Sequence, residues 1–573
     1  MRFAHIVVDI LGMPDDLQLQ LNQIKREAEE RDAQRRAQQE GIPYLSPERI
    51  SLNLEALALL DEHSAREGHC AIITAKEKRI AVIIYDPKYS KTKEALKRLE
   101  EMGYAATLYI VSLSSLSRIL DQYRFVSATH AAISGSVDVE EDKTDTTVSI
   151  KHLNSIAQVK ETINAHLGKG KTSSIMDILL LGAIANRASD IHLEPKEKTA
   201  KIRYRVDGLL NDVIDDIPHD TYRALISRIK LLSNLKLNIR DEAQDGRFTI
   251  NLTERPDIEV RVAVAPSEFG EVVVMRILDA QAISLDLKDL GLRSDDLDII
   301  QEQLKRPNGM ALNTGPTGSG KTTTLYAFLK HRLSPEVKII TIEDPIEYHL
   351  DGIEQTQVDN EGEYTFASGL RSLMRQDPDI ILVGEIRDKE TAEIAVQASL
   401  TGHLVFSTVH ANEATGAIPR LLDLGVKANS LAPALNLLIA QRLLRRLCEK
   451  CKKEVTPDQK IKEQIKSFLA HLPERVNKEP YANISLYEPV GCEYCNHTGF
   501  RGRIGVYELL VVDGALQELI TKEAGQREID TLVKTKGFVS MQEDGILKVI
   551  TGITTFSEVE DITGKIVWDK KSE

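Results

Sequence analysis

The sequence lacks long apolar runs, a dense set of cysteines and an excess of positive charge. No stretch approaches the roughly 18 consecutive apolar residues that mark a membrane-spanning helix. Five cysteines among 573 residues do not make a disulfide framework and indicate a reducing compartment. The formal net charge of −14 disfavours a broad nucleic-acid-binding surface, because phosphates require basic partners. Residues 1–9 break their apolar run at Asp9 and lack the small-residue cleavage site of a signal peptide. We therefore expect a cytoplasmic protein without a nucleic-acid partner.

The length predicts several domains, and 42% hydrophobic with 28% charged residues is a globular composition. We expect a small N-terminal α/β domain at 1–126, a linker at 127–170, a strand-containing domain at 171–283 and a larger α/β domain at 284–573. The linker is predicted because residues 127–149 are rich in Ser, Thr, Asp, Glu and Gly with little periodicity. Residues 16–40 predict a solvated helix, and a docking helix for a partner is the alternative.

The most informative motif is a complete phosphate-binding loop, Gly-Pro-Thr-Gly-Ser-Gly-Lys-Thr, at 315–322. Its glycines let the backbone N–H groups turn inward toward phosphate oxygens, and the lysine can reach the β- and γ-phosphates. The flanking residues predict a short strand at 309–313 before the loop and a helix at 322–332 after it. The sequence therefore predicts a nucleoside triphosphate site. The nucleotide-binding residues are Gly315, Pro316, Thr317, Gly318, Ser319, Gly320, Lys321, Thr322 and Thr323.

Acidic residues follow the next two predicted strands. The strand at 338–342 leads into Glu343, Asp344 and Glu347, and the strand at 379–383 leads into Glu385. The carboxyl ends of parallel strands are where ligands sit in α/β sheets. Two acidic clusters there suit hydrolysis, in which one carboxylate serves Mg²⁺ and another orients water. Thr322 and Glu385 are the predicted magnesium ligands.

Two histidines, His403 and His410, bracket a further predicted strand at 404–408. Such histidines could sense the γ-phosphate or bridge to a neighbouring subunit, and a structural role is the ordinary alternative.

Four of the five cysteines form two C-x-x-C pairs, Cys448 with Cys451 and Cys492 with Cys495. Each pair can clamp one edge of a tetrahedral Cys₄ zinc site, which leaves no open position, so the predicted zinc is structural. The remaining cysteine, Cys70, is expected to be a small buried residue.

Four ordered segments carry a family resemblance: residues 315–322, Thr341–Glu347, Leu370–Arg387 and Thr401–His410. They resemble the Walker A, Asp box, Walker B and His box of the type II secretion and type IV pilus assembly ATPases, the GspE/PilB family. The resemblance covers roughly residues 171–565. It implies a homohexameric ring of RecA-like P-loop ATPase domains, each preceded by a PAS-like α/β domain and a small N-terminal α/β domain.

The resemblance also implies roles for individual residues. Glu347 would orient or deprotonate water, Glu385 would serve the metal, and His403 and His410 would belong to the active site, with Glu343 and Asp344 as weaker candidates. The arginines implied are Arg261 and Arg276 facing the nucleotide, and Arg371, Arg375 and Arg387 at the same site or at a subunit contact. Ordinary salt bridges are the alternative for each arginine.

Retraction ATPases of type IV pili resemble the motor but lack both the zinc arm at 448–495 and an extra N-terminal domain. The presence of both here favours an assembly or secretion motor. We expect a Mg²⁺-dependent hexameric ATPase at the inner membrane that powers type IV pilus assembly; the alternative is the motor of type II secretion. The implied partners are an inner-membrane platform protein and a cytoplasmic adaptor bound by the N-terminal domain. The rival hypotheses are a scaffold that binds ATP without turnover and a nucleic-acid translocase.

Overall fold

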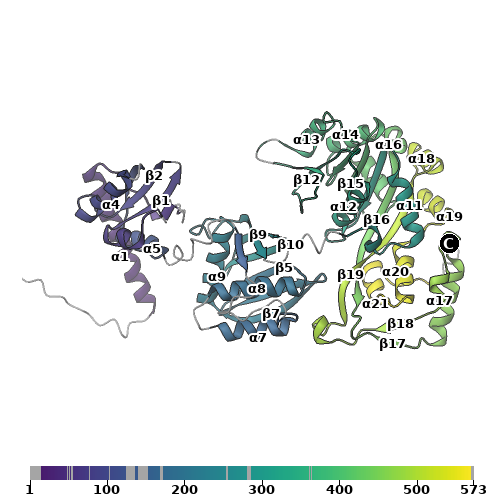
Figure 1. Ribbon diagram of the computed structural model, residues 1–573, viewed down its shortest axis with the longest axis horizontal. Helices are drawn as coiled ribbons and strands as arrows, with labels where there is room; N and C mark the ends of the chain where they lie inside the picture. The colour runs from purple at the N-terminus through teal and green to yellow at the C-terminus, as the bar shows by residue number, and fades with distance from the viewer. Residues whose placement is uncertain are drawn as a thin grey trace, which may run out of the picture.

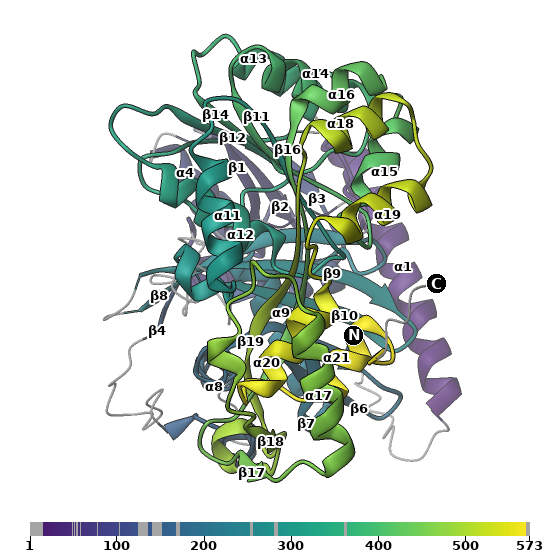
Figure 2. The ribbon, with the colours of Figure 1, turned by 90° about the vertical axis from the view of Figure 1, so that its right-hand side faces the viewer.

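The computed structural model describes residues 15–568, except 48–49, 51, 53–55, 58, 77, 102–103, 124–135, 140–151, 168–171, 253–255, 280–284, 360–361 and 363. Three bodies follow one another along its long axis (Figure 1). The N-terminal domain is purple, a sheet-rich middle domain is blue, and the motor domain runs from teal to yellow (Figures 1 and 2). Among the described helices, none combines the length and apolar character that a membrane span requires.

The N-terminal domain is a small three-stranded sheet covered by helices. Strand β2 is central, antiparallel to β1 and parallel to β3. The elements are α1 (Asp15–Glu40), α3 (Glu62–Glu67), β1 (Cys70–Lys76), β2 (Arg79–Ile84), α4 (Ser90–Glu101), β3 (Ala105–Ile110) and α5 (Leu113–Leu120). Cys70 is fully buried here, as predicted, and burial raises the pKa of its thiol to about 12.

Helix α1 is a helix as predicted, but it is not solvated on all sides. Ala33 and Ala37 are buried in the N-terminal core. Glu30 accepts hydrogen bonds from the hydroxyls of Tyr44 (2.6 Å) and Ser112 (2.7 Å). One face of α1 therefore belongs to its own domain, because alanines let the helix approach closely and a paired carboxylate can be buried.

The middle domain is a seven-stranded sheet in the order β4-β8-β9-β10-β5-β6-β7. All pairs are antiparallel except β4 with β8. Its strands are β4 (Ser136–Val139), β5 (Ala188–Pro195), β6 (Thr199–Val206), β7 (Leu209–Pro218), β8 (Gln244–Leu252), β9 (Ile258–Ser267) and β10 (Gly270–Leu278). Helices α7 (Ile156–His166), α8 (Thr172–Ala185) and α9 (His219–Leu232) share its core.

The predicted linker at 127–170 is corrected by this sheet, because β4 and α7 both lie within it and belong to the middle domain. Val137 of β4 is buried and pairs with Ile250 of β8. Ser155 and Gln158 form a capping box at the start of α7, whose Ile156, Val159 and Ile163 are buried. The helical spacing of these apolar residues was present in the sequence. The prediction extended the linker over this helix because the preceding segment, 127–149, is polar and has little periodicity.

The motor domain is a second seven-stranded sheet, in the order β13-β12-β14-β15-β11-β16-β19. It is parallel except for β19, which runs antiparallel to β16. The first five motor strands along the chain are β11 (Gly309–Thr314), β12 (Ile339–Glu343), β13 (Glu354–Gln357), β14 (Ile380–Val383) and β15 (Leu404–Val409). Helix α11 (Ser294–Leu304) precedes these strands, and the helices among and after them are α12 (Lys321–Arg332), α13 (Phe366–Leu373), α14 (Lys389–Leu400), α15 (Ala417–Asp423) and α16 (Ala428–Ala434). Strands β11, β12, β14 and β15 are buried at every position, as expected of a parallel sheet with both faces covered.

The C-terminal part extends this sheet and carries the cysteine arm. Strands β16 (Leu435–Leu447) and β19 (Phe500–Val511) form its long edge. Between them lie β17 (Lys453–Val455), α17 (Gln459–His471) and β18 (Leu486–Glu488). The chain ends in α18 (Gly514–Thr521), α19 (Gln526–Thr535), α20 (Met541–Ile550) and α21 (Phe556–Thr563). Figure 1 shows α20 and α21 alongside β19, with β17 and β18 at the lower edge of the motor domain. The α/β class predicted from sequence is confirmed.

Candidate active site

The phosphate-binding loop connects β11 to α12 as predicted, and it borders a cleft of about 770 Å³ between the motor and middle domains. Gly315, Gly318 and Gly320 have φ values of 151°, 80° and 89°, which favour glycine. A Cβ at Gly315 would also lie 2.6 Å from the carbonyl oxygen of Gln441. The glycines are therefore required both for the turn and for the close contact with β16.

Several polar groups of the loop are arranged to receive an anion. The Lys321 ammonium donates to the carbonyl oxygens of Gly315 (2.8 Å) and Pro316 (3.2 Å). Burial lowers the pKa of Lys321, while nearby Glu385 favours its charged form. Ser319 Oγ is buried and has no hydrogen-bond partner among the described residues. The start of α12 adds the N-terminal partial charge that favours phosphate. These features fit the predicted triphosphate.

Two residues of β16, Gln441 and Arg442, support the loop and were missed from sequence. Gln441 Oε1 accepts hydrogen bonds from Asn313 Nδ2 (2.9 Å) and Thr324 Oγ1 (2.8 Å), so it ties β11 to α12. The Arg442 guanidinium donates to the carbonyl oxygens of Gln441 and Asn412, both at 3.0 Å. Only the pairing of β16 with β11 brings these residues to the loop, and no local sequence motif predicts that pairing.

The acids after β12 separate into a buried one and an accessible one. Glu343 is 4% exposed and accepts hydrogen bonds from the hydroxyls of Tyr326 and Thr341 and from the amide of Gln355. Burial raises its pKa. The Glu347 side chain is 35% exposed, lines the cleft and lies 3.7 Å from an Arg261 guanidinium nitrogen. Glu347 is thus free to meet water, whereas every oxygen of Glu343 is already engaged.

Glu385 follows β14 and also lines the cleft. Its carboxylate lies 2.6 Å from the Arg387 guanidinium and 3.4 Å from His410 Nε2. His410 follows β15 and reaches the same edge of the sheet, because β14 and β15 are adjacent and parallel. Thr322 and Asp344 line this cleft too. A hydroxyl and carboxylates on one wall are the hard oxygen donors that Mg²⁺ prefers, so the residues fit that ion.

By contrast, His403 does not line this cleft in the part of the chain that the structure describes. It precedes Leu404, which pairs with Gly309 at the start of β11, whereas Val409 pairs with Thr314 beside the phosphate loop. Six strand residues, or about 20 Å, separate the two histidines. The His403 ring contacts the carbonyl oxygen of Ala398 at 3.0 Å, at the end of α14. Two histidines that bracket a strand lie at opposite ends of it, so His410 reaches the cleft and His403 does not.

Arginines of the middle domain lie at or beside the cleft, and two of them, Arg205 and Arg276, line it together with the phosphate loop. Arg261 of β9 donates to the carbonyl oxygen of Ile346, next to Glu347. Arg276 of β10 and Arg205 of β6 line the cleft and are held by Asp190, at 3.1 and 3.5 Å. Asp190 and Arg205 were not predicted as site residues.

The arginines of the motor domain fall into two groups, those that line the cleft and those that do not. Arg387 and Arg503 line the cleft. Arg371 is exposed and pairs with Glu390 at 2.5 Å, and Arg375 is exposed. In the described structure neither Arg371 nor Arg375 lines the cleft. For Arg371 the alternative of an ordinary salt bridge is the one observed.

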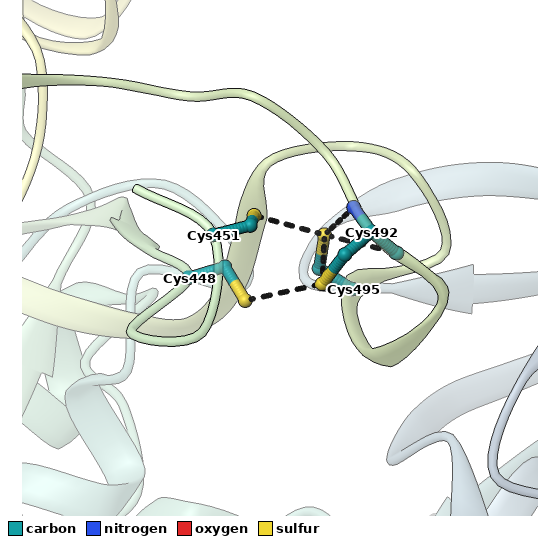
Figure 3. A group of neighbouring side chains, drawn as sticks. All are labelled: Cys448, Cys451, Cys492 and Cys495. Atoms are coloured by element: carbon teal, nitrogen blue, oxygen red, sulfur yellow. Dashed lines mark hydrogen bonds between the residues drawn. The ribbon is translucent and has the colours of Figure 1, made fainter. Parts of the chain in front are cut away.

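The four paired cysteines meet at the base of the arm (Figure 3). Their Sγ atoms all lie within 4.8 Å of one another, with separations of 3.9 Å (Cys448–Cys492), 3.8 Å (Cys451–Cys495) and 3.7 Å (Cys492–Cys495). Zn–S bonds of about 2.3 Å place tetrahedral sulfur ligands about 3.8 Å apart. The four thiols therefore fit a structural zinc ion.

Comparisons with known proteins agree with this geometry. Residues 166–561 match the family model described as "Type II/IV secretion system protein". The type II secretion system ATPase E of Vibrio cholerae is 47% identical over 389 residues, covering 68% of this chain and 75% of the relative. The type IV pilus assembly ATPase PilB of Myxococcus xanthus is 36% identical over 526 residues, covering 91% and 89%.

Among solved structures, the Legionella pneumophila ATPase DotB superposes with a TM-score of 0.50 at 21% identity, over 68% of this chain and 95% of that one. At that identity the likeness supports the fold alone. The phosphate loop, the acids at successive strand ends and the family match together show that this chain belongs to the type II/IV secretion system protein family and is an ATPase.

Proposed function

We propose that this chain is a cytoplasmic, Mg²⁺-dependent motor that hydrolyses ATP to power type IV pilus assembly. One observation carries the catalytic part of the proposal. The phosphate loop, Glu347 and Glu385 of the motor domain share a single cleft with arginines of the middle domain. A cleft that only stored ATP would not need an accessible carboxylate opposite the loop.

In the proposed reaction, the loop amides and Lys321 hold the phosphates. Lys321 exchanges its present carbonyl partners for phosphate oxygens, which are stronger acceptors for an ammonium. Glu347 orients a water molecule and accepts its proton, and the Arg261 guanidinium, 3.7 Å away, holds this carboxylate at the edge of the cleft. Thr322 and Glu385 would hold Mg²⁺, which would supply charge neutralisation to the phosphates. His410 and Arg387 orient Glu385 through the contacts described above.

The arginines of the middle domain give the reaction a mechanical consequence. Arg205 and Arg276 belong to a different domain from the phosphate loop, so charge attraction to ATP closes the cleft and phosphate release opens it. We propose that six copies in a ring pass this movement to an inner-membrane platform protein. The N-terminal domain would meanwhile hold a cytoplasmic adaptor, so that the chain stays at the membrane without spanning it.

Pilus assembly is preferred over type II secretion because of where the similarity extends. The pilus assembly relative matches 91% of this chain, which includes most of the N-terminal region, whereas the secretion relative matches 68%. The higher identity of the secretion relative, 47%, makes a type II secretion motor the alternative. The identity of the platform protein therefore distinguishes a pilus assembly motor from a type II secretion motor.

The test is ATP hydrolysis by the purified oligomer with the platform protein of a type IV pilus system in vesicles, compared with the platform protein of a type II secretion system. We expect the pilus protein to stimulate phosphate release several-fold and the secretion protein to leave it unchanged. The reverse pattern would identify a secretion motor. Mass measurement of the same oligomer should give six chains.

A further inference from the structure

The loop that carries the second cysteine pair also contacts the middle domain directly. Asn496, immediately after Cys495, has φ 51° and extends its side chain across the boundary between the domains. Its Oδ1 accepts a hydrogen bond from the backbone N–H of Ile156, the first residue of α7, at 2.8 Å. Its Nδ2 donates to Asn186 Oδ1 at 3.2 Å. One side chain thus joins the arm to two elements of the neighbouring domain.

The receiving side of this contact is rigid. Asn186 is 2% exposed, and its Nδ2 donates to the carbonyl oxygens of Leu153 and Gly182, both at 2.8 Å. These bonds tie α8 to the chain entering α7. The Asn496 contact is therefore made to a fixed point of the middle domain, rather than to a loop that could follow the arm.

A second hydrogen bond across the domain boundary lies between this contact and the nucleotide cleft. The Gly502 N–H of β19 donates to Asp207 Oδ2 at 2.8 Å, at the turn between β6 and β7. Arg205 donates to the carbonyl oxygen of Gly208 in the same turn at 3.1 Å. Residues from both domains leave only about 20 Å³ of free space between them here. Arg503, next to Gly502, lines the nucleotide cleft together with Arg205.

The cysteine site fixes the motor side of these contacts. Cys495 Sγ accepts hydrogen bonds from the N–H groups of Cys492 (3.2 Å) and Gly499 (3.3 Å), so the loop 492–499 winds around this sulfur. The Cys448 N–H binds the carbonyl oxygen of Gly499 at 2.9 Å and ties the two cysteine pairs together. Asn496 is one residue from the sulfur, and the loop around that sulfur sets its position.

We propose that the zinc knuckle is the motor half of an interdomain joint, in which Asn496 and Asp207 set how Arg205 and Arg276 approach the nucleotide. Asn496 is a positioning residue, since it touches neither nucleotide nor metal. The joint rests on the proposed ATP hydrolysis for its effect on rate, but its geometry is measurable without turnover.

The test uses the full-length chain with Asn496→Gly, which keeps the left-handed backbone and removes both side-chain bonds. Asn496→Asp retains the acceptor for Ile156, and Asn483→Gly on the exposed surface of the same arm is the matched control. Elemental analysis checks that each variant still binds one zinc ion. Hydrogen–deuterium exchange of peptides covering residues 152–163 then reports the Ile156 amide, and steady-state kinetics report turnover.

For Asn496→Gly we expect several-fold faster exchange in these peptides with full zinc content. Loss of two hydrogen bonds predicts a roughly five- to thirtyfold lower kcat, with the KM for ATP nearly unchanged because the phosphate loop is intact. Asn496→Asp should restore most of the protection and rate, and Asn483→Gly should match the wild type. In a variant that already carries Arg205→Ala and Arg276→Ala, adding Asn496→Gly should lower kcat little further.

Unchanged exchange in Asn496→Gly would overturn the joint, and so would altered exchange with an unchanged kcat. An equal loss of kcat in the background that lacks both arginines would also contradict it. If Asn496→Gly shows the predicted faster exchange but the wild type hydrolyses no ATP, the proposed function is refuted instead. The two failures are therefore distinguishable.

Discussion

Glu343 and Glu347 are four residues apart in one acidic motif, yet their surroundings give them opposite roles. Three donors surround the Glu343 carboxylate, which is 4% exposed. A buried acceptor of this kind holds β12, α12 and β13 together, so substitution of Glu343 should lower the free energy of unfolding. Glu347 has its cation partner on another domain and its carboxylate open to the cleft. The motif alone does not separate the two, because burial depends on the side chains that cover them.

A pair of matched substitutions separates these roles. Glu347→Gln should retain ATP binding and lower hydrolysis by about 10² or more, with little change in thermal stability. Glu343→Gln places an amide N–H₂ against donors and should lower the free energy of unfolding by about 1–3 kcal/mol. Nucleotide-binding, phosphate-release and thermal-unfolding measurements check both variants. A Glu347→Gln protein that hydrolyses ATP at the wild-type rate would show that another group activates water.

Among the elements, those with a strong local pattern were predicted well. The phosphate loop with its flanking strand and helix, the strand predicted at 404–408 (β15) and the two C-x-x-C pairs all lie where the sequence indicates, to within a residue. Elements defined by distant partners were missed or misjudged. Strand β4 acquires its place only by pairing with β8, more than 100 residues later. Gln441 and Arg442 reach the phosphate loop only because β16 lies beside β11.

The cysteine arm gives a prediction at the scale of elements. Four sulfurs at tetrahedral spacing should bind about one zinc ion per chain, measurable by elemental analysis of protein purified without added metal. Cys451→Ser should lose zinc and make the arm more susceptible to proteolysis near β17 and β18, because Cys451 lies two residues before β17 and its sulfur is one of the four that join the two ends of the arm. Cys70→Ser, in the N-terminal core, should keep its zinc. A folded wild-type protein free of zinc would contradict the site.

On the scale of the whole molecule, a buried charge network joins the two ends of the motor domain. Arg293, just before α11, pairs with Asp296 (2.7 Å) and with Asp544 of α20 (3.0 Å). Arg475 and Lys548 bind the same two carboxylates. The Arg293, Asp296 and Asp544 side chains are each no more than 5% exposed. The C-terminal helices are thus held to the start of the motor, although more than 240 residues lie between.

Removing the central cation should destabilise the motor as a unit. Arg293→Met leaves buried carboxylates short of a partner, which costs about 3–5 kcal/mol and should lower the thermal transition by several degrees. Arg247→Met is the matched control, because Arg247 is 77% exposed and its ion pair spans 3.8 Å. Calorimetry of both variants checks this. Equal transitions for Arg293→Met and the wild type would show that the network adds nothing to stability.

The most direct test of the central claim is continuous phosphate release by the purified full-length chain with ATP and Mg²⁺, beside Lys321→Ala. We predict steady release by the wild type that disappears in Lys321→Ala, because that variant removes the cation that holds the β- and γ-phosphates. A wild-type chain that binds ATP without releasing phosphate, or a Lys321→Ala chain that releases it equally fast, would contradict the account.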